Sequence, residues 1–184
     1  MLNGGMYENS DGKREWWLNG KRHREDGPAV EYPSGTRSWY QNDQRHREDG
    51  PAIEYASGDR EWWINGKRHR DGAPAAEYIH GNGGTRIWYQ NDLLHREDGP
   101  AVEHSDGTCR WYLNGLRHRE DGPAIEHVNG TRSWWINGQR HREDGPAIEH
   151  VNGTRSWCIN GKEYTEEEYN IEMRLRKWGL SVDA

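Results

Sequence analysis

A seven-residue segment that returns at almost constant spacing is the feature that most constrains this chain. His-Arg-Glu-Asp-Gly-Pro-Ala occurs five times without change, beginning at His23, His46, His95, His118 and His141. An altered copy begins at His69, and the spacing between copies is 23 residues, lengthened once to 26. Self-similarity at such a period indicates a repeat architecture, in which each unit packs against its neighbours.

Each repeat also contains a strong short signal for a β-hairpin. A Trp begins the hairpin segment of each repeat, and an Asn stands three positions after it. The residue directly after the Trp is aromatic in every repeat but the last. Asn-Gly between two such runs favours a two-residue type I′ turn. A turn centred on Asn65 and Gly66 places Trp62 directly opposite His69, where side chains stack. The same register pairs Trp39 with His46 and Trp134 with His141 as structural residues of the repeat.

A second hairpin joins successive repeats. Residues 31–37 predict a three-residue turn with Gly35 in the left-handed conformation and Glu31 opposite Arg37. We also expect Arg37 to stack on Trp39, two residues further along the same strand face. The Glu-Asp-Gly-Pro segment between the hairpins breaks the ladder, because Pro donates no hydrogen bond and Gly permits a bend. The predicted fold is therefore all-β, an elongated, twisted antiparallel hairpin array.

The two ends of the chain differ from the repeats between them. Residues 6–20 match half a repeat, so residues 1–164 are assigned to the array as this half repeat followed by six His-Arg-Glu-Asp-Gly-Pro-Ala units. Thr165 and Glu168 form a capping-box pattern, which predicts a helix over 166–178 that ends before Gly179. Residues 165–184 are therefore a capping helix and tail, with an apolar stripe expected to cover the last strand. The stripe consists of Ile171, Leu175 and Trp178.

Composition excludes several classes of protein. The chain is 30% charged and has no Phe, but it has 11 Trp and 9 Tyr, so its core must consist of thin layers of rings. No apolar run approaches the roughly 20 residues that span a membrane. The net charge of -6 argues against a general nucleic-acid binder. Two cysteines form no disulfide framework, which favours a reducing, cytoplasmic location.

Repetition also argues against catalysis and metal binding. Almost every His, Asp and Glu has several equivalents, whereas an active site needs a unique constellation. Equivalent histidines on neighbouring repeats would lie roughly 10 Å apart, too far for Zn–N bonds of about 2.1 Å. We expect no catalytic residue, no metal and no cofactor, and therefore no enzyme.

The third and fourth repeats depart from the pattern together. Their longer loop and their apolar substitutions beside polar positions indicate a partner contact. Relaxed selection or a structural kink would explain the same changes. The candidate partner-binding residues are Ile79, His80, Asn82, Ile87, Leu93 and Leu94, with the tyrosines of the second aromatic position, Tyr40, Tyr89 and Tyr112.

The unit Trp-x-x-Asn-Gly-Lys-Arg-His…Gly-Pro-Ala-x-Glu-Tyr-x-x-Gly resembles the MORN repeat in a variant form. It is closer still to Trp-rich His-Arg-Glu-Asp-Gly-Pro-Ala repeats of bacteriophage and bacterial proteins, and the resemblance covers residues 6–169. It implies a stack of antiparallel hairpins that acts as a scaffold or docking surface. A phage origin would imply counter-defence, such as inhibition of a CRISPR effector or of a nucleotide-signalling system.

Two functional hypotheses follow. The first is a non-enzymatic protein-binding module whose unknown partner is another protein, such as a defence factor in the host-cell cytoplasm. The second is a ligand-binding protein that sequesters a nucleotide, or binds nucleic acid, through Trp, His and Arg surfaces. Long open sheet edges leave a homo-oligomer open as well, and no membrane insertion is expected.

Overall fold

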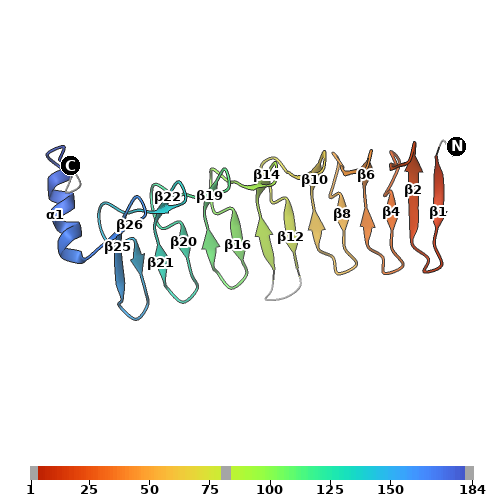
Figure 1. Cartoon of the computed structure of the whole chain (residues 1–184). Coiled ribbons are helices and arrows are strands. Elements are labelled where there is room, and N and C mark those ends of the chain that lie inside the picture. The colour runs from red at the N-terminus through yellow and green to blue at the C-terminus, as the bar shows by residue number, and fades with distance from the viewer. Residues whose placement is uncertain (1–3, 80–83, 181–184) are drawn as a thin grey trace. The chain divides into compact units, whose positions relative to one another are not determined.

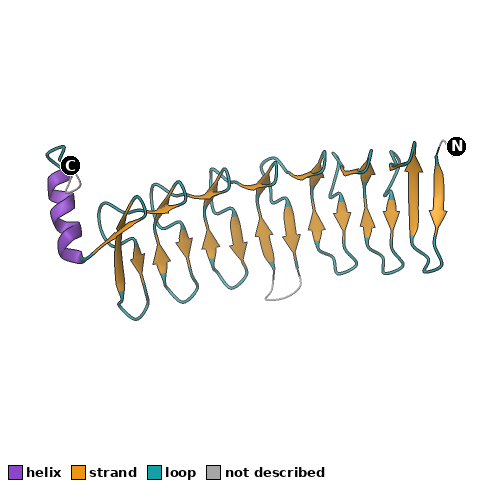
Figure 2. Ribbon diagram, in the orientation of Figure 1, coloured by secondary structure: helices purple, strands orange, loops and turns teal. Residues whose placement is uncertain are grey.

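A computed structural model describes residues 4–79 and 84–180 of the chain. These residues form 26 strands and one helix, α1 (Glu166–Arg176), as Figure 2 shows. The chain divides into two compact units, Met1–His95 and Arg96–Ala184. Within each unit antiparallel hairpins follow one another in chain order (Figure 1). The predicted all-β hairpin repeat with a C-terminal helix is confirmed.

The first unit contains one continuous ladder and a set of short hairpins. The ladder strands, in spatial order, are β1 (Gly5–Glu8), β2 (Arg14–Leu18), β4 (Val30–Glu31), β5 (Arg37–Ser38), β8 (Ile53–Glu54), β9 (Arg60–Glu61), β12 (Ala76–Tyr78) and β13 (Thr85–Ile87). The short pairs are β6 (Tyr40–Gln41) with β7 (Gln44–Arg45), β10 (Trp63–Ile64) with β11 (Lys67–Arg68), and β14 (Tyr89–Gln90) with β15 (Leu93–Leu94). Strand β3 (Lys21–Arg22) pairs with the end of β2.

The second unit repeats this plan. Its ladder consists of β16 (Val102–His104), β17 (Cys109–Arg110), β20 (Ile125–Glu126), β21 (Arg132–Ser133), β24 (Ile148–Glu149), β25 (Arg155–Ile159) and β26 (Lys162–Tyr164). Its short pairs are β18 (Tyr112–Leu113) with β19 (Leu116–Arg117), and β22 (Trp135–Ile136) with β23 (Gln139–Arg140). Within each unit the ladder turns and the short pairs lie at opposite edges (Figure 1).

The local turn chemistry sets both hairpin types. Asn65 and Gly66 have φ values of 50° and 76°, as a type I′ turn requires, and Trp63 pairs with Arg68 in the predicted register. In the longer hairpin Gly35 has a φ of 94°, and Glu31 pairs with Arg37. Both turn predictions are confirmed.

The core is thin and is built around small residues. The Ala that ends each repeat motif is fully buried at positions 29, 52, 75, 101, 124 and 147. Ala52 clusters with Ile53 and Trp63, and its carbonyl accepts a 2.8 Å hydrogen bond from the N–H of Trp39. In the second repeat the Tyr40 ring is buried, whereas the neighbouring Trp39 is half-buried.

The helix follows its capping signal but not its predicted apolar stripe. Thr165 and Glu168 form the expected capping box, and α1 ends at Arg176, two residues earlier than predicted. The stripe prediction is wrong, because Ile171 and Trp178 are 50% and 80% exposed. Tyr169 is buried instead.

A polar contact explains which helix face is buried. The Tyr169 hydroxyl donates to the carbonyl of Arg142 and accepts from the N–H of Gly145, both at 3.0 Å. These two hydrogen bonds satisfy backbone groups of the last repeat loop, a gain that an apolar side chain at this position would not provide. Helix α1 thus lies against β25 and β26, as expected for an element that covers the last strands.

Candidate functional site

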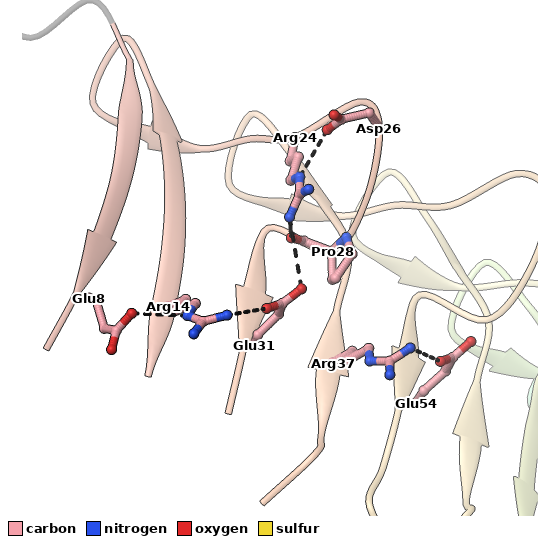
Figure 3. Close-up of polar contacts among 8 residues, drawn as sticks. All are labelled: Glu8, Arg14, Arg24, Asp26, Pro28, Glu31, Arg37 and Glu54. Carbon is pink, nitrogen blue, oxygen red and sulfur yellow. Dashed lines mark hydrogen bonds and ion pairs between the residues drawn. The ribbon is translucent and has the colours of Figure 1, made fainter. Parts of the chain in front are cut away.

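One arginine organises each His-Arg-Glu-Asp-Gly-Pro segment, called here the repeat loop. The guanidinium carbon of Arg24 lies 4.1 Å from the centroid of the Trp16 ring. Its Nε donates to Asp26 at 2.9 Å, and its Nη1 donates to the carbonyl of Pro28 at 3.3 Å and lies 3.8 Å from Glu31 (Figure 3). The loop therefore folds around a single cation that has one aromatic and three oxygen neighbours.

The same arrangement returns along the chain. The guanidinium carbon lies 4.1 Å from the ring for Arg47 and 3.8 Å for Arg142. The prediction that Arg37 stacks on Trp39 is therefore corrected: Arg47 occupies that ring, and Arg37 lies 3.9 Å from Glu54 (Figure 3). Arg14 likewise extends across the sheet, to Glu8 and Glu31 (Figure 3).

The glycine of each loop makes room for this arginine. A Cβ added to Gly50 would lie 2.9 Å from the guanidinium carbon of Arg47, which is closer than real side chains approach. The altered loop carries Ala73 at this position and Gly72 in place of the Asp. Its Arg70 keeps the Trp62 ring at 3.8 Å and the carbonyl of Pro74 at 3.1 Å. This loop thus lacks an Asp partner for its Arg and carries a methyl group where the other loops have Gly, while Arg70 keeps Glu77 at 3.5 Å.

The carboxylates of the loops face solvent. Glu48 and Asp49 are both 84% exposed, whereas Arg47 beneath them is 22% exposed. The hydrogen bond from Arg47 lowers the pKa of Asp49, and the corresponding bonds lower the pKa of Asp26 and Asp98. Each intact loop therefore presents two exposed carboxylates over one covered guanidinium. Within either unit, we call these loops the acidic loop edge.

Grooves with an apolar floor separate successive loops of the second unit. A groove of about 830 Å³ lies between the loop of residues 96–100 and the loop of residues 118–121, with Trp111 and Leu113 also in its lining. An equivalent groove of about 660 Å³ follows one repeat later, with Trp134 and Ile136 in the same positions. Arg119 and Arg142 lie over the rings of Trp111 and Trp134, which are half-buried, so part of each indole lines a groove whose walls carry carboxylates.

The repeat histidines join one repeat to the next. The N–H of His46 donates to the carbonyl of Trp39 at 3.2 Å, which confirms the predicted backbone register. The His46 side chain, however, extends toward the following hairpin, where its Nδ1 accepts a 3.2 Å hydrogen bond from the N–H of Asn65. Its Nε2 lies 3.6 Å from Glu48. The imidazole therefore links two repeats and contacts a loop carboxylate.

The structure does not bring the predicted partner-binding residues into one patch. Ile79 is 53% exposed and directly follows β12 of the ladder, whereas Leu93 is 48% exposed and belongs to β15 of a short pair. Leu94, Ile87, Tyr89 and Tyr112 are half-buried, and Tyr40 is buried. His80 and Asn82 lie outside the described residues.

A buried acidic cluster in the first unit was missed by the sequence reasoning. Glu61 is 3% exposed and accepts hydrogen bonds from Tyr78 Oη at 2.7 Å, Trp63 Nε1 at 2.9 Å and Tyr55 Oη at 3.3 Å. Arg68 Nε lies 3.6 Å from the same carboxylate. The sequence signal for this cluster is the Glu at position 61, where several repeats have Ser. Because this carboxylate already has three hydrogen-bond donors and a nearby Arg, we assign the cluster a structural role, in which Glu61 joins neighbouring hairpins.

Neither metal-site geometry nor a membrane-spanning helix is found in residues 4–79 and 84–180. No group of three or more His, Cys, Asp or Glu side chains in these residues is arranged to hold a metal ion. Helix α1 is too short and too polar to cross a bilayer. Compared with known proteins, the chain matches no family model and no curated sequence.

Proposed function

We propose that the protein is a non-enzymatic protein-binding module that uses its acidic loop edge to hold a basic surface of another protein. One observation carries this proposal: in the second unit the loop carboxylates Asp98 and Asp121, each 84% exposed, line a groove that also has Trp111 in its lining. Exposed carboxylates steer a basic partner and select against acidic ones. Tryptophan in a groove suits a buried anchor, since aromatic residues dominate the energetics of protein interfaces.

The repetition of the loops supports binding rather than catalysis. Equivalent grooves follow one another along the second unit, and neither contains a catalytic constellation that the other lacks. Repeated weak contacts act together when a partner spans several of them, because later contacts form at a high effective concentration.

A narrower form of the proposal follows from the resemblance to phage repeat proteins. An RNA-guided effector holds nucleic acid in a positively charged channel. Such a channel is a basic surface of the kind that the acidic loop edge would occupy. Inhibition of a host defence protein is therefore the specific version of this function that we propose to test first.

Charge neutralisation at the loops tests the proposal. The variant Glu25→Gln, Glu48→Gln, Glu120→Gln removes three exposed carboxylates and leaves the arginine-bound aspartates intact. The control Glu163→Gln, Glu166→Gln, Glu167→Gln makes the same change in charge at exposed positions elsewhere.

The readout is native mass spectrometry after capture from bacterial lysate, followed by titration of the identified partner at two salt concentrations. We expect the loop variant to lose the partner and the control to keep it. Equal binding by the loop variant and the parent protein would contradict the proposal.

A further inference from the structure

The short hairpins of the first unit stack arginines between aromatic rings. The guanidinium carbon of Arg22 lies 4.3 Å from the Tyr40 ring centroid. That of Arg45 lies between two rings, 5.9 Å from Tyr40 and 5.0 Å from Trp63. Each contact is within the range of cation–π attraction. Arg68 continues the stack on the far side of Trp63, at 4.8 Å.

The middle arginine of this stack has no acidic partner. Arg22 Nε lies 2.9 Å from Asp43, and Arg68 Nε lies 3.6 Å from Glu61. The Nε of Arg45 is buried and has no hydrogen-bond partner, and among the described residues its guanidinium has no ion pair. A partly desolvated cation without an anion is unfavourable, so this position is suited to an anion from solution.

A groove of about 660 Å³ opens beside this arginine. Its lining includes the cations Arg22, Arg45 and Lys67 and the carboxylates Asp43 and Asp92. Asp43 is engaged by Arg22, and Asp92 accepts a 2.9 Å hydrogen bond from a backbone N–H. Lys67 is exposed and has no ion pair with any described residue. Two lining cations, Arg45 and Lys67, therefore have no acidic partner among the described residues, against one lining carboxylate, Asp92, that has no cationic partner there.

The aromatic rings of the groove are covered. Tyr40 is 7% and Trp63 is 9% exposed, and arginines already occupy their faces. A ligand's own ring therefore finds no open stacking surface. Recognition here depends on negative charge and on the fork of N–H donors that a guanidinium presents to phosphate oxygens.

We propose that this groove is a phosphate site, in which Arg45 and Lys67 bind inorganic phosphate or the phosphate of a small phosphate monoester. The site lies on short-hairpin residues and is separate from the loop carboxylates of the proposed protein-binding function. It gives the first unit a ligand of opposite charge to the partner of the acidic loop edge.

Calorimetric titration of the full chain with inorganic phosphate, adenosine 5′-monophosphate and adenosine tests the site. We expect both phosphates to bind and adenosine not to bind. Similar affinity for the two phosphates indicates that the anion alone is recognised, and tighter binding of the nucleotide identifies the ester as the preferred source. Absence of phosphate binding, or equal binding of adenosine, would overturn the proposal.

Matched variants locate the binding. Arg45→Met should weaken phosphate binding about tenfold or more, as expected for loss of a hydrogen-bonded charge. Lys67→Met should weaken it severalfold, whereas Lys21→Met, at the same repeat position but outside the groove lining, should not.

If Arg45→Met fails to fold in a thermal melt, the comparison of the two lysine variants decides, since both lysines are exposed. Equal weakening by Lys67→Met and Lys21→Met would overturn the site. The variant Glu25→Gln, Glu48→Gln, Glu120→Gln should keep full phosphate binding, which separates this proposal from the protein-binding one.

Discussion

The hydroxyl of Tyr78 donates a 2.7 Å hydrogen bond to Oε1 of Glu61, a carboxylate that is almost completely removed from solvent. Tyr78→Phe removes this donor and should lower the free energy of unfolding by about 1.5–3 kcal/mol, the range for hydrogen bonds to charged groups. Urea unfolding measures the difference. The control Tyr32→Phe alters the same repeat position where the ring is exposed and should change stability by less than about 0.5 kcal/mol. Equal losses of unfolding free energy in both variants would show that the contact with Glu61 contributes nothing specific.

The same contact predicts a loss of stability at alkaline pH. Burial, followed by the hydrogen bond to Glu61, raises the pKa of Tyr78 in the folded protein above its usual value of 10.0. The folded state then holds this proton more tightly than the unfolded state, so the contribution to stability is complete below pH 10 and declines as the pH rises further. Thermal melts between pH 8 and pH 11 should show a steeper decline for the parent protein than for Tyr78→Phe. Parallel curves would contradict this linkage.

Gly50 leaves little room for a side chain beside Arg47, which predicts the effect of adding one. Gly50→Ala places a methyl group against the guanidinium and should destabilise the protein by about 1–3 kcal/mol, the usual cost of overpacking. The triple variant Glu48→Asp, Asp49→Gly, Gly50→Ala reproduces the altered loop of residues 69–75. It should recover part of the loss, because that loop already accommodates Ala73. A triple variant less stable than Gly50→Ala would show that the substitutions are independent.

The attachment of α1 predicts local opening of the helix. Tyr169→Phe removes two hydrogen bonds to the loop backbone and should cost about 1–3 kcal/mol. Amide hydrogen exchange should accelerate within residues 166–176. Trp178→Ala is the control, since that side chain is 80% exposed and its loss should leave protection of the helix unchanged. Faster exchange in the Trp178 variant alone would show that the apolar stripe, and not Tyr169, attaches the helix.

Local rules explain which parts of the fold could be predicted. Asn65 and Gly66 specify a type I′ turn by themselves, and the turn then determines every pairing of its hairpin. The partner of the Trp39 ring was not predictable in this way. Arg47 reaches it only because the repeat loop bends back, whereas the sequence shows only that Arg37 precedes Trp39 by two residues on one strand. The helix face was mistaken for a related reason, because the hydroxyl of Tyr169 finds two backbone partners that no apolar pattern reveals.

The candidate site was harder to predict than the fold. The sequence predicts partner contacts in the irregular third and fourth repeats and at the tyrosines of the second aromatic position, but none in the regular loops. The structure separates Ile79 from Leu93 by placing them in different hairpins, while it exposes the carboxylates of every intact loop that it describes. Glu61 was unpredictable because its partners Tyr55 and Tyr78 come from separate strands or turns, six and seventeen positions away.

The two acidic residues of the second repeat loop have different structural roles. Asp49 is held by Arg47 and maintains the loop, whereas Glu48 contacts only an imidazole at its edge. The side chain at position 48 can therefore vary without disturbing its loop, whereas the equivalent Glu143 also lies 3.7 Å from Arg176 of α1. Over generations such an array could change its specificity one position at a time, and a protein engineer could rewrite the row of exposed side chains while keeping the scaffold unchanged.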